Sequence, residues 1–266
     1  MGRKVLRLLT SLGAVVCLSA LLLAAGVRLD NYILRRRAEH LLADIRSLEL
    51  RKSTYSDARK TMDRYGDNVR IEGPCQPYWC DALISLDNTV WKHIAFFGKR
   101  QNLLHFYSGV GGRVAYVRAS IRVRNNIVWG KRFAEIVESG TCWKETGGGR
   151  VCLALIGTIS TDAPWHPPVS HPEYEISKSS GCFGCIDGNV RVTPYAEPAD
   201  ILRLSDINLS CITGLHPCET QADILPSAWK EYSIEQAPGR RPTTRGPRPG
   251  THPRRPWPRS GRPHPR

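Results

Sequence analysis

The chain has 266 residues, enough for one full-sized folded domain with appended segments. Its hydrophobic content of 41% is ordinary for a folded protein, but its formal net charge of +14 at pH 7 is not. Nine arginines and no acidic residue lie in residues 237–266, which leaves +5 for the remainder. The strong basicity therefore belongs to a C-terminal tail and excludes a highly charged folded surface as its source.

An uncharged run of twenty residues, 8–27, follows a short basic head near the N-terminus. A helix of that length reaches about 30 Å, which is the thickness of the hydrocarbon core of a bilayer. A cleavable signal peptide is the alternative, because Ala24, Ala25 and Gly26 are small, but secretory apolar regions run only about 7–15 residues. We expect residues 8–27 to be an uncleaved transmembrane anchor whose partner is the lipid bilayer.

Two features bear on which side of the membrane the rest of the chain occupies. Arginines at positions 28 and 35–37 follow the apolar run and lean towards a cytoplasmic location. The cysteines favour the opposite side, because eight of the nine lie beyond the run in local pairs typical of disulfides in an oxidising compartment. The pairs are Cys75 and Cys80, Cys142 and Cys152, Cys182 and Cys185, and Cys211 and Cys218. We give the cysteines more weight and expect a single-pass protein of the cell membrane with the bulk of the chain extracytoplasmic.

A helical pair is expected directly after the anchor. Apolar residues recur there at alternating steps of four and three, as they do along one face of a helix from about residue 30 to 50. These residues are Leu34, Ala38, Leu41, Ile45 and Leu48. A second helix is marked by Thr54 and Asp57, which have the spacing of a capping box, and ends at Gly66 as its C-terminal cap.

From residue 71 onwards the periodicity changes to two, which is typical of β-strands. The expected strands cover residues 80–88, 89–97, 113–124, 127–138, 151–161, 174–180 and 188–195, and a helix is expected over 197–211. In 113–124 polar residues alternate with apolar ones, so one face of this strand should meet water. Asn125 and Asn126 suit a tight turn with positive φ, and therefore predict a hairpin between the two longest strands.

These elements predict an α+β fold, in which an N-terminal transmembrane helix and a helical pair precede a mainly antiparallel β-sheet domain. The predicted segments are a cytoplasmic head (1–7), the anchor (8–27), a helical stalk (28–68), a disulfide-containing extracytoplasmic domain (69–236) and a disordered Pro/Arg-rich tail (237–266). The tail has too few apolar side chains to fold, and its charge suits an anionic surface or polymer.

No enzyme signature occurs in the chain: there is no G-x-S-x-G, P-loop, H-E-x-x-H or G-x-G-x-x-G sequence. We therefore name no catalytic residue, no cofactor and no metal site. His166, His171 and Glu173 lie close enough in sequence to hold a metal, but a lone histidine pair in a loop is more typical of surface residues.

The C-x-x-C formed by Cys182 and Cys185 has three interpretations. A thiol–disulfide catalyst needs a helix after the motif, whereas a strand pattern follows here. Zinc could be held together with Cys211, Cys218 and His216, although the second spacing is wider than usual. Structural disulfides are the third, either within each pair or crossed between the pairs, and these we expect.

The stretch RAEHLLADIRSLELRKSTYSDARKTMDRYGDN at 37–68, followed by Cys75, Cys80 and strands, resembles uncharacterised single-pass membrane proteins found in acidobacterial genomes. The resemblance covers mainly residues 1–100, implies anchoring and export, and supplies no site residues. Our functional hypothesis is a non-enzymatic role in binding or envelope structure. The alternatives are an envelope thiol–disulfide oxidoreductase using residues 182–185, and binding of an anionic polymer through the tail.

Overall fold

The computed structural model describes residues 2–90, 107, 109–144, 150–162, 174–179, 185–192, 198–214 and 218–235, in part by their backbone alone. Its helices are α1 (Gly2–Ser47), α2 (Tyr55–Tyr65), α5 (Pro198–Leu204), α6 (Gln221–Ile224) and α7 (Pro226–Glu235), with single 3-10 turns η1 (Gly66–Asn68) and η2 (Leu209–Ile212). Its strands are β1 (Val69–Ile71), β2 (Trp79–Asp87), β3 (Val114–Arg124), β4 (Ile127–Lys144), β5 (Arg150–Asp162), β6 (Tyr174–Ser179) and β7 (Cys185–Val192).

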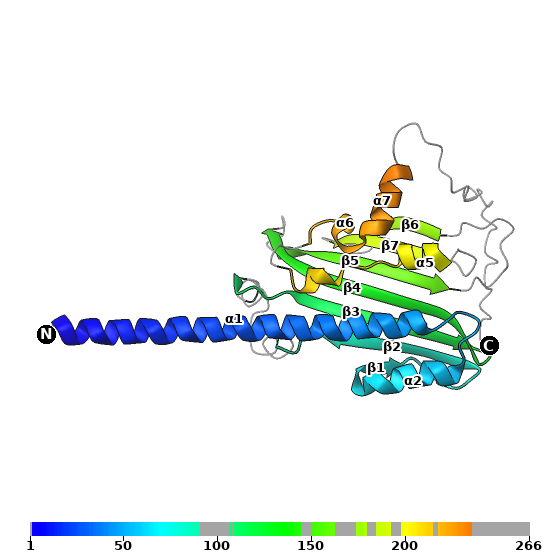
Figure 1. Cartoon of the computed structure of the whole chain (residues 1–266), viewed down its shortest axis with the longest axis horizontal. Helices are drawn as coiled ribbons and strands as arrows, with labels where there is room; N and C mark the ends of the chain where they lie inside the picture. The colour runs from blue at the N-terminus through cyan, green and yellow to red at the C-terminus, as the bar shows by residue number, and fades with distance from the viewer. Residues whose placement is uncertain are drawn as a thin grey trace, which may run out of the picture.

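The strands form one seven-stranded sheet in the order β1-β2-β3-β4-β5-β7-β6. Every pair of neighbouring strands is antiparallel except β5 and β7, which are parallel. Strand β7 lies between β5 and β6 in the sheet. The helices gather on one side of this sheet, where α1 lies lengthwise along the strands (Figure 1). The chain is thus an α+β protein with a long apolar N-terminal helix and a mostly antiparallel sheet, as the sequence predicts.

The β3–β4 hairpin confirms the alternation and the turn read from the sequence. Ala115, Val117, Ala119, Ile121 and Val123 are at most 1% exposed, while the residues between them face outward to varying degrees. The turn residues Asn125 and Asn126 have φ angles of 50° and 65°. Asparagine tolerates this left-handed region better than most residues, which is why this dipeptide closes a two-residue hairpin.

Helix α1 joins the predicted anchor to the predicted stalk without a break. All five apolar residues predicted for its buried face are at most 4% exposed, and the same face also buries Val27, Asn31 and Leu42. We call this face the docking seam. Its apolar residues from Leu34 onwards and the buried residues of α2 belong to the same hydrophobic core as the sheet, so the helical pair packs directly against the strands.

Polar contacts fix both ends of the docking seam. Near its start, the side-chain amides of Asn31 and Asn88 pair at 2.9 Å, and Asn88 Oδ1 accepts the backbone N–H of Ala115 at 2.7 Å. At its end, Lys131 Nζ donates to the carbonyls of Ile45 and Arg46 at 3.0 and 3.3 Å, and also to that of Leu48. Lysine at a helix C-terminus satisfies carbonyls that have no partner within the helix.

The strand predicted over residues 89–97 is wrong at its start, where Thr89 and Val90 are helical; residues 91–97 lie outside the described chain. The cause is distant in sequence. The carboxylate of Asp30 on α1 accepts the backbone N–H groups of Thr89 and Val90 at 3.2 and 3.0 Å. A carboxylate at this position satisfies the first amides of a helix, as a local capping residue would.

The N-terminal cap of α2 is as predicted. Thr54 and Asp57 form a reciprocal capping box, and the backbone N–H of Thr54 donates to the Asp57 carboxylate at 2.9 Å. These hydrogen bonds hold the pKa of Asp57 below its ordinary value. The helix ends at Gly66, whose φ is 44°.

The single helix predicted over 197–211 is instead split into α5 and η2. The interruption is local: Asn208 adopts a non-helical conformation, and its side chain accepts the N–H of Ser210 at 3.2 Å and caps η2. Of the four residues expected on one helical face, Leu204, Ile207 and Cys211 are nevertheless buried, and Ile201 is partly buried. Helices α6 and α7 were not expected from the sequence.

Because the docking seam carries the core, Leu41→Ala should destabilise the folded domain by about 2–5 kcal/mol, as expected for a fully buried leucine. Leu22→Ala is the matched control, since Leu22 lies on the same helix but is 66% exposed. It should change the free energy of unfolding by less than about 0.5 kcal/mol. Urea unfolding of the full chain in mild detergent, monitored by near-ultraviolet circular dichroism, measures both free energies of unfolding. Equal losses of stability in the two variants would contradict the role of the docking seam in the core.

Candidate functional site

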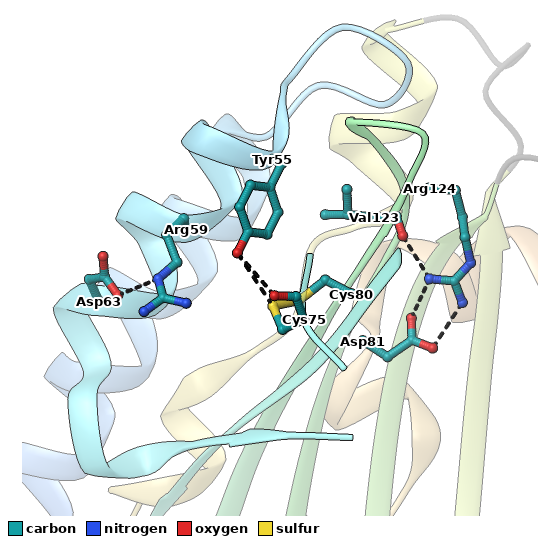
Figure 2. The surroundings of a disulfide bond; sticks show 8 residues. All are labelled: Tyr55, Arg59, Asp63, Cys75, Cys80, Asp81, Val123 and Arg124. Atoms are coloured by element: carbon teal, nitrogen blue, oxygen red, sulfur yellow. Dashed lines mark hydrogen bonds and ion pairs between the residues drawn. A yellow bond between two sulfur atoms is a disulfide. The ribbon is translucent and has the colours of Figure 1, made fainter. Parts of the chain in front are cut away.

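Two of the four predicted cysteine pairs are disulfides in the structure. Cys75 and Cys80 are bonded, and the hydroxyl of Tyr55 on α2 lies 3.4 Å from the carbonyl oxygen of Cys75 (Figure 2). Cys80 is the second residue of β2 and is buried. The bond therefore closes the loop that enters β2 and holds it under α2, which is a structural role.

Cys211 and Cys218 form the second disulfide. Cys211 belongs to η2 and is buried in the core, whereas Cys218 precedes α6 and is partly buried. The bond ties the end of η2 to the start of α6. It excludes the crossed arrangement in which these cysteines would pair with those of the C-x-x-C.

The other two pairs are described only in part: Cys142, Cys152 and Cys185 by their backbone, and Cys182 not at all. Cys142 and Cys152 are Cα partners in the β4–β5 ladder, the register that a cross-strand disulfide requires. Cys185 is the first residue of β7, and Cys182 lies outside the described residues. Disulfides within 142/152 and within 182/185 therefore stay predictions. The motif leads into a strand, whereas a thioredoxin-like catalyst requires a helix there.

The metal candidates of the sequence are not tested by the structure. His166, His171, Glu173 and His216 lie outside the described residues. Within the part of the chain that is described, no three histidine, cysteine, aspartate or glutamate side chains gather as a metal site would require.

Glu135 on β4 is a buried carboxyl that sequence reasoning missed. It is 0% exposed, and neither carboxylate oxygen has a hydrogen-bond partner. Val117 of β3 and Gly157 of β5 are its neighbours in the sheet. A Cβ at Gly157 would lie 2.9 Å from Cγ1 of Ile224, so α6 covers the sheet directly beside Glu135. The sequence did carry a signal, because Glu135 stands two positions from both Phe133 and Val137 and so shares the apolar face of its strand with them.

Burial raises the pKa of Glu135 well above its ordinary value, and the positive charge of Arg35 on α1 opposes this only in part. The guanidinium of Arg35 is engaged elsewhere: it donates to Glu39 Oε1 at 2.8 Å and to Thr213 Oγ1 at 3.0 Å. Burial therefore favours the protonated form of Glu135 inside the interface between the helix layer and the sheet. Buried groups with raised pKa values are often functional, but this one lines neither of the hollows in the helix layer described next.

Two hollows flank Leu42 and Arg46 on α1. One is a small apolar cavity of about 70 Å³ between α1, the sheet and α5. The other is a polar groove of about 350 Å³ between α1 and residues 206–210. Two arginines of the groove already have partners: Arg35 pairs with Glu39, and Arg46 donates to the carbonyl of Ser205. The small volume of the cavity and these existing contacts in the groove make both hollows weak candidates.

The outward face of the sheet is a stronger candidate. Arg118 on β3, Arg132 on β4 and Arg191 on β7 are all exposed. The ladder places them on one face: Ser120, two residues from Arg118, is opposite Arg132, which is opposite Ser160, which is opposite Arg191. This is the face opposite the buried residues of β3. We call these three residues the arginine row.

One end of this outward face is held rigidly by a fourth arginine. Arg124 donates to both carboxylate oxygens of Asp81, at 2.9 and 2.8 Å, and its guanidinium lies 3.2 Å from the centre of the Trp79 ring. Figure 2 shows the paired groups side by side on β2 and β3. A planar bidentate pair of this kind is structural, and so distinguishes Arg124 from the exposed arginine row.

Searches with the whole chain found no matching family model, curated protein or solved structure. The resemblance to acidobacterial membrane proteins therefore stays a prediction, and the function has to be argued from the geometry.

The raised pKa of Glu135 leads to a prediction about how the stability of the folded chain depends on pH. In the unfolded chain this carboxyl ionises near pH 4.3, whereas the folded protein keeps it protonated to higher pH. Stability is therefore full below about pH 4 and falls as pH rises towards the folded pKa, by about 1.4 kcal/mol per unit of separation. Glu135→Gln removes this loss, so its free energy of unfolding should exceed that of the unaltered chain at pH 8 and match it at pH 4.

Glu72→Gln is the control for loss of a carboxylate, because Glu72 is exposed and meets water whether or not the chain is folded. Urea unfolding at pH 4, 6 and 8 compares the three proteins. A difference between Glu135→Gln and the unaltered chain that does not grow with pH would show that Glu135 is ionised in the folded state.

Proposed function

We propose that the chain is a membrane-anchored extracytoplasmic protein that acts by binding an anionic partner and not by catalysis. The observation that carries the proposal is the double role of α1. Its exposed apolar part, beginning at Ser11, is long enough to cross a bilayer, and its second half is the central helix of the core. A protein built in this way holds its sheet domain at a membrane surface, and binding is a function that needs only such a placement and an accessible surface.

The two disulfides support the extracytoplasmic location. Structural disulfides persist in oxidising compartments and are rare in the cytosol. Both Cys75–Cys80 and Cys211–Cys218 hold loops against the core, so both belong to the folded structure. The arginine row supports the choice of partner, because three exposed guanidinium groups on one sheet face attract anions. The tail at 237–266 would add to the same attraction.

Topology is tested with alkaline phosphatase or green fluorescent protein fused after residue 240. An extracytoplasmic domain predicts active phosphatase and a dark fluorescent protein, because phosphatase needs disulfides that form only outside the cytosol. Fluorescence without phosphatase activity would place the domain in the cytoplasm and overturn this part of the proposal. Fusions after residue 7 are the control: they lack the apolar run and stay in the cytoplasm, so the fluorescent protein should be bright and the phosphatase inactive.

Anion binding is tested with dextran sulfate as the probe. Replacing Arg118, Arg132 and Arg191 by glutamine should weaken its binding to the full chain by about threefold to a hundredfold at low salt, since each of the three exposed contacts contributes about 0.2–1 kcal/mol. Raising the salt concentration should reduce the difference by screening.

The matched control replaces three exposed lysines elsewhere, Lys52, Lys60 and Lys230, by glutamine, which removes the same charge. Equal weakening in both triple variants would show that net charge alone attracts the probe. Deleting residues 237–266 from each protein separates the tail from the sheet face. If that deletion abolishes binding and the arginine row has no effect, the tail is the binding element.

A further inference from the structure

The side of α1 that faces away from the domain carries a second apolar stripe. Leu22, Leu29, Tyr32 and Ile33 are 66%, 59%, 49% and 48% exposed. At the same level along the helix axis, the docking seam residues Val27, Asn31 and Leu34 are at most 2% exposed. Residues two apart on a helix point about 200° from each other, so Leu29 lies opposite Val27 and Ile33 lies opposite Asn31. We call the exposed residues the outer stripe.

The outer stripe continues past the end of the uncharged run, because the charged residues between its members point elsewhere. Asp30 is turned into the domain, where it accepts the N–H groups of Thr89 and Val90. The guanidinium of Arg28 lies over Gly111, so close that a Cβ there would be 2.8 Å from its Nη2. The outward side of α1 is therefore apolar from the membrane segment as far as Ile33.

The length of this apolar extension is close to the thickness of the headgroup layer of a bilayer. The run 8–27 covers the hydrocarbon core of about 30 Å, and the six residues from 28 to 33 add about 9 Å. Each headgroup layer is about 5–8 Å thick, from the difference between the whole bilayer and its core. Leu29, Tyr32 and Ile33 thus come to lie at the level of the headgroups, where tyrosine is enriched.

Cations close the outer stripe on the side away from the membrane. Arg36 Nε donates to the hydroxyl of Tyr32 at 2.9 Å, and its guanidinium lies 5.3 Å from the centre of the Tyr32 ring. Arg37 follows it in the sequence. Along α1, apolar side chains are thus followed by a tyrosine and then by arginines. This order matches the acyl chains, the headgroup layer and the lipid phosphates that the helix would pass in turn.

We propose that the outer stripe is a lipid-binding surface, on which Leu29, Tyr32 and Ile33 insert into the phospholipid headgroup layer of the membrane that α1 spans. The inference rests on the proposed anchoring and deepens it: the folded domain sits directly against the bilayer with no spacer. A second copy of α1 is a poorer occupant. Parallel pairing along this stripe would bring two Arg36 side chains together, and their like charges would repel each other.

Photocrosslinking of the full chain in phosphatidylcholine–phosphatidylglycerol vesicles tests the proposal. A p-benzoylphenylalanine replaces Leu22, Ile33 or His40, one at a time, and adducts with radiolabelled phospholipid are measured. His40 is the matched control, because it is exposed on nearly the same side of α1, two turns beyond Ile33. We expect lipid adducts from positions 22 and 33 in comparable yield, and at least tenfold less from position 40.

The other outcomes are distinguishable. Lipid adducts at position 22 with none at 33 would overturn the lipid-binding surface while leaving the membrane anchor intact. A crosslinked dimer at position 33 in place of a lipid adduct would also overturn it, and would show that a second copy covers the stripe. Absence of lipid adducts at position 22 would contradict the anchoring itself. Adducts of equal yield at positions 33 and 40 would show unspecific lipid contact and would likewise overturn the proposal.

Discussion

Between Val27 and Leu48 one face of α1 is buried against the sheet, and this contact organises the molecule around it. Because α1 is unbroken from Gly2 to Ser47, the same contact fixes the direction of the apolar N-terminal half relative to the strands. Hydrogen bonds lock the helix lengthwise at both ends, through Asn31 and Asn88 at one and Lys131 at the other. Burial lowers the pKa of Lys131 to about 8, which shows how far this side chain has been withdrawn from water.

The same interface also contains a residue that lowers its stability. Glu135 lies in the sheet beneath the helix layer, and a buried carboxyl without a partner opposes packing that the apolar seam favours. Protonation avoids the much larger penalty of a buried charge. Arg35, the charge that could stabilise the ionised form, is held by Glu39 and Thr213. Because Arg35 keeps these partners, its charge offsets the burial of Glu135 only in part, and the raised pKa of Glu135 reflects this.

The sequence predicted best what depends on local spacing. The seam from Leu34 to Leu48, the capping box of Thr54 and Asp57, and the Asn125–Asn126 turn are all set by residues a few positions apart. The error at the start of the strand predicted over 89–97 arose because a distant residue decides the conformation there. Thr89 and Val90 are helical because Asp30, about sixty positions earlier, accepts their N–H groups. The arginine row is likewise a product of strand register, since its members come from β3, β4 and β7 and share no local pattern.

The direction of α1 also determines how the outward sheet face can be reached. The helix lies lengthwise along the strands (Figure 1), and a membrane helix tilts on average only about 20° from the bilayer normal. The strands of an anchored chain therefore stand steeply on the membrane, and the arginine row faces sideways, away from α1 and along the bilayer plane. Under the proposed anchoring, lipid phosphates would meet Arg36 and Arg37 on α1, whereas the arginine row would be open to a partner that approaches laterally. The two cationic surfaces would then face different anions, because one helix holds the sheet upright.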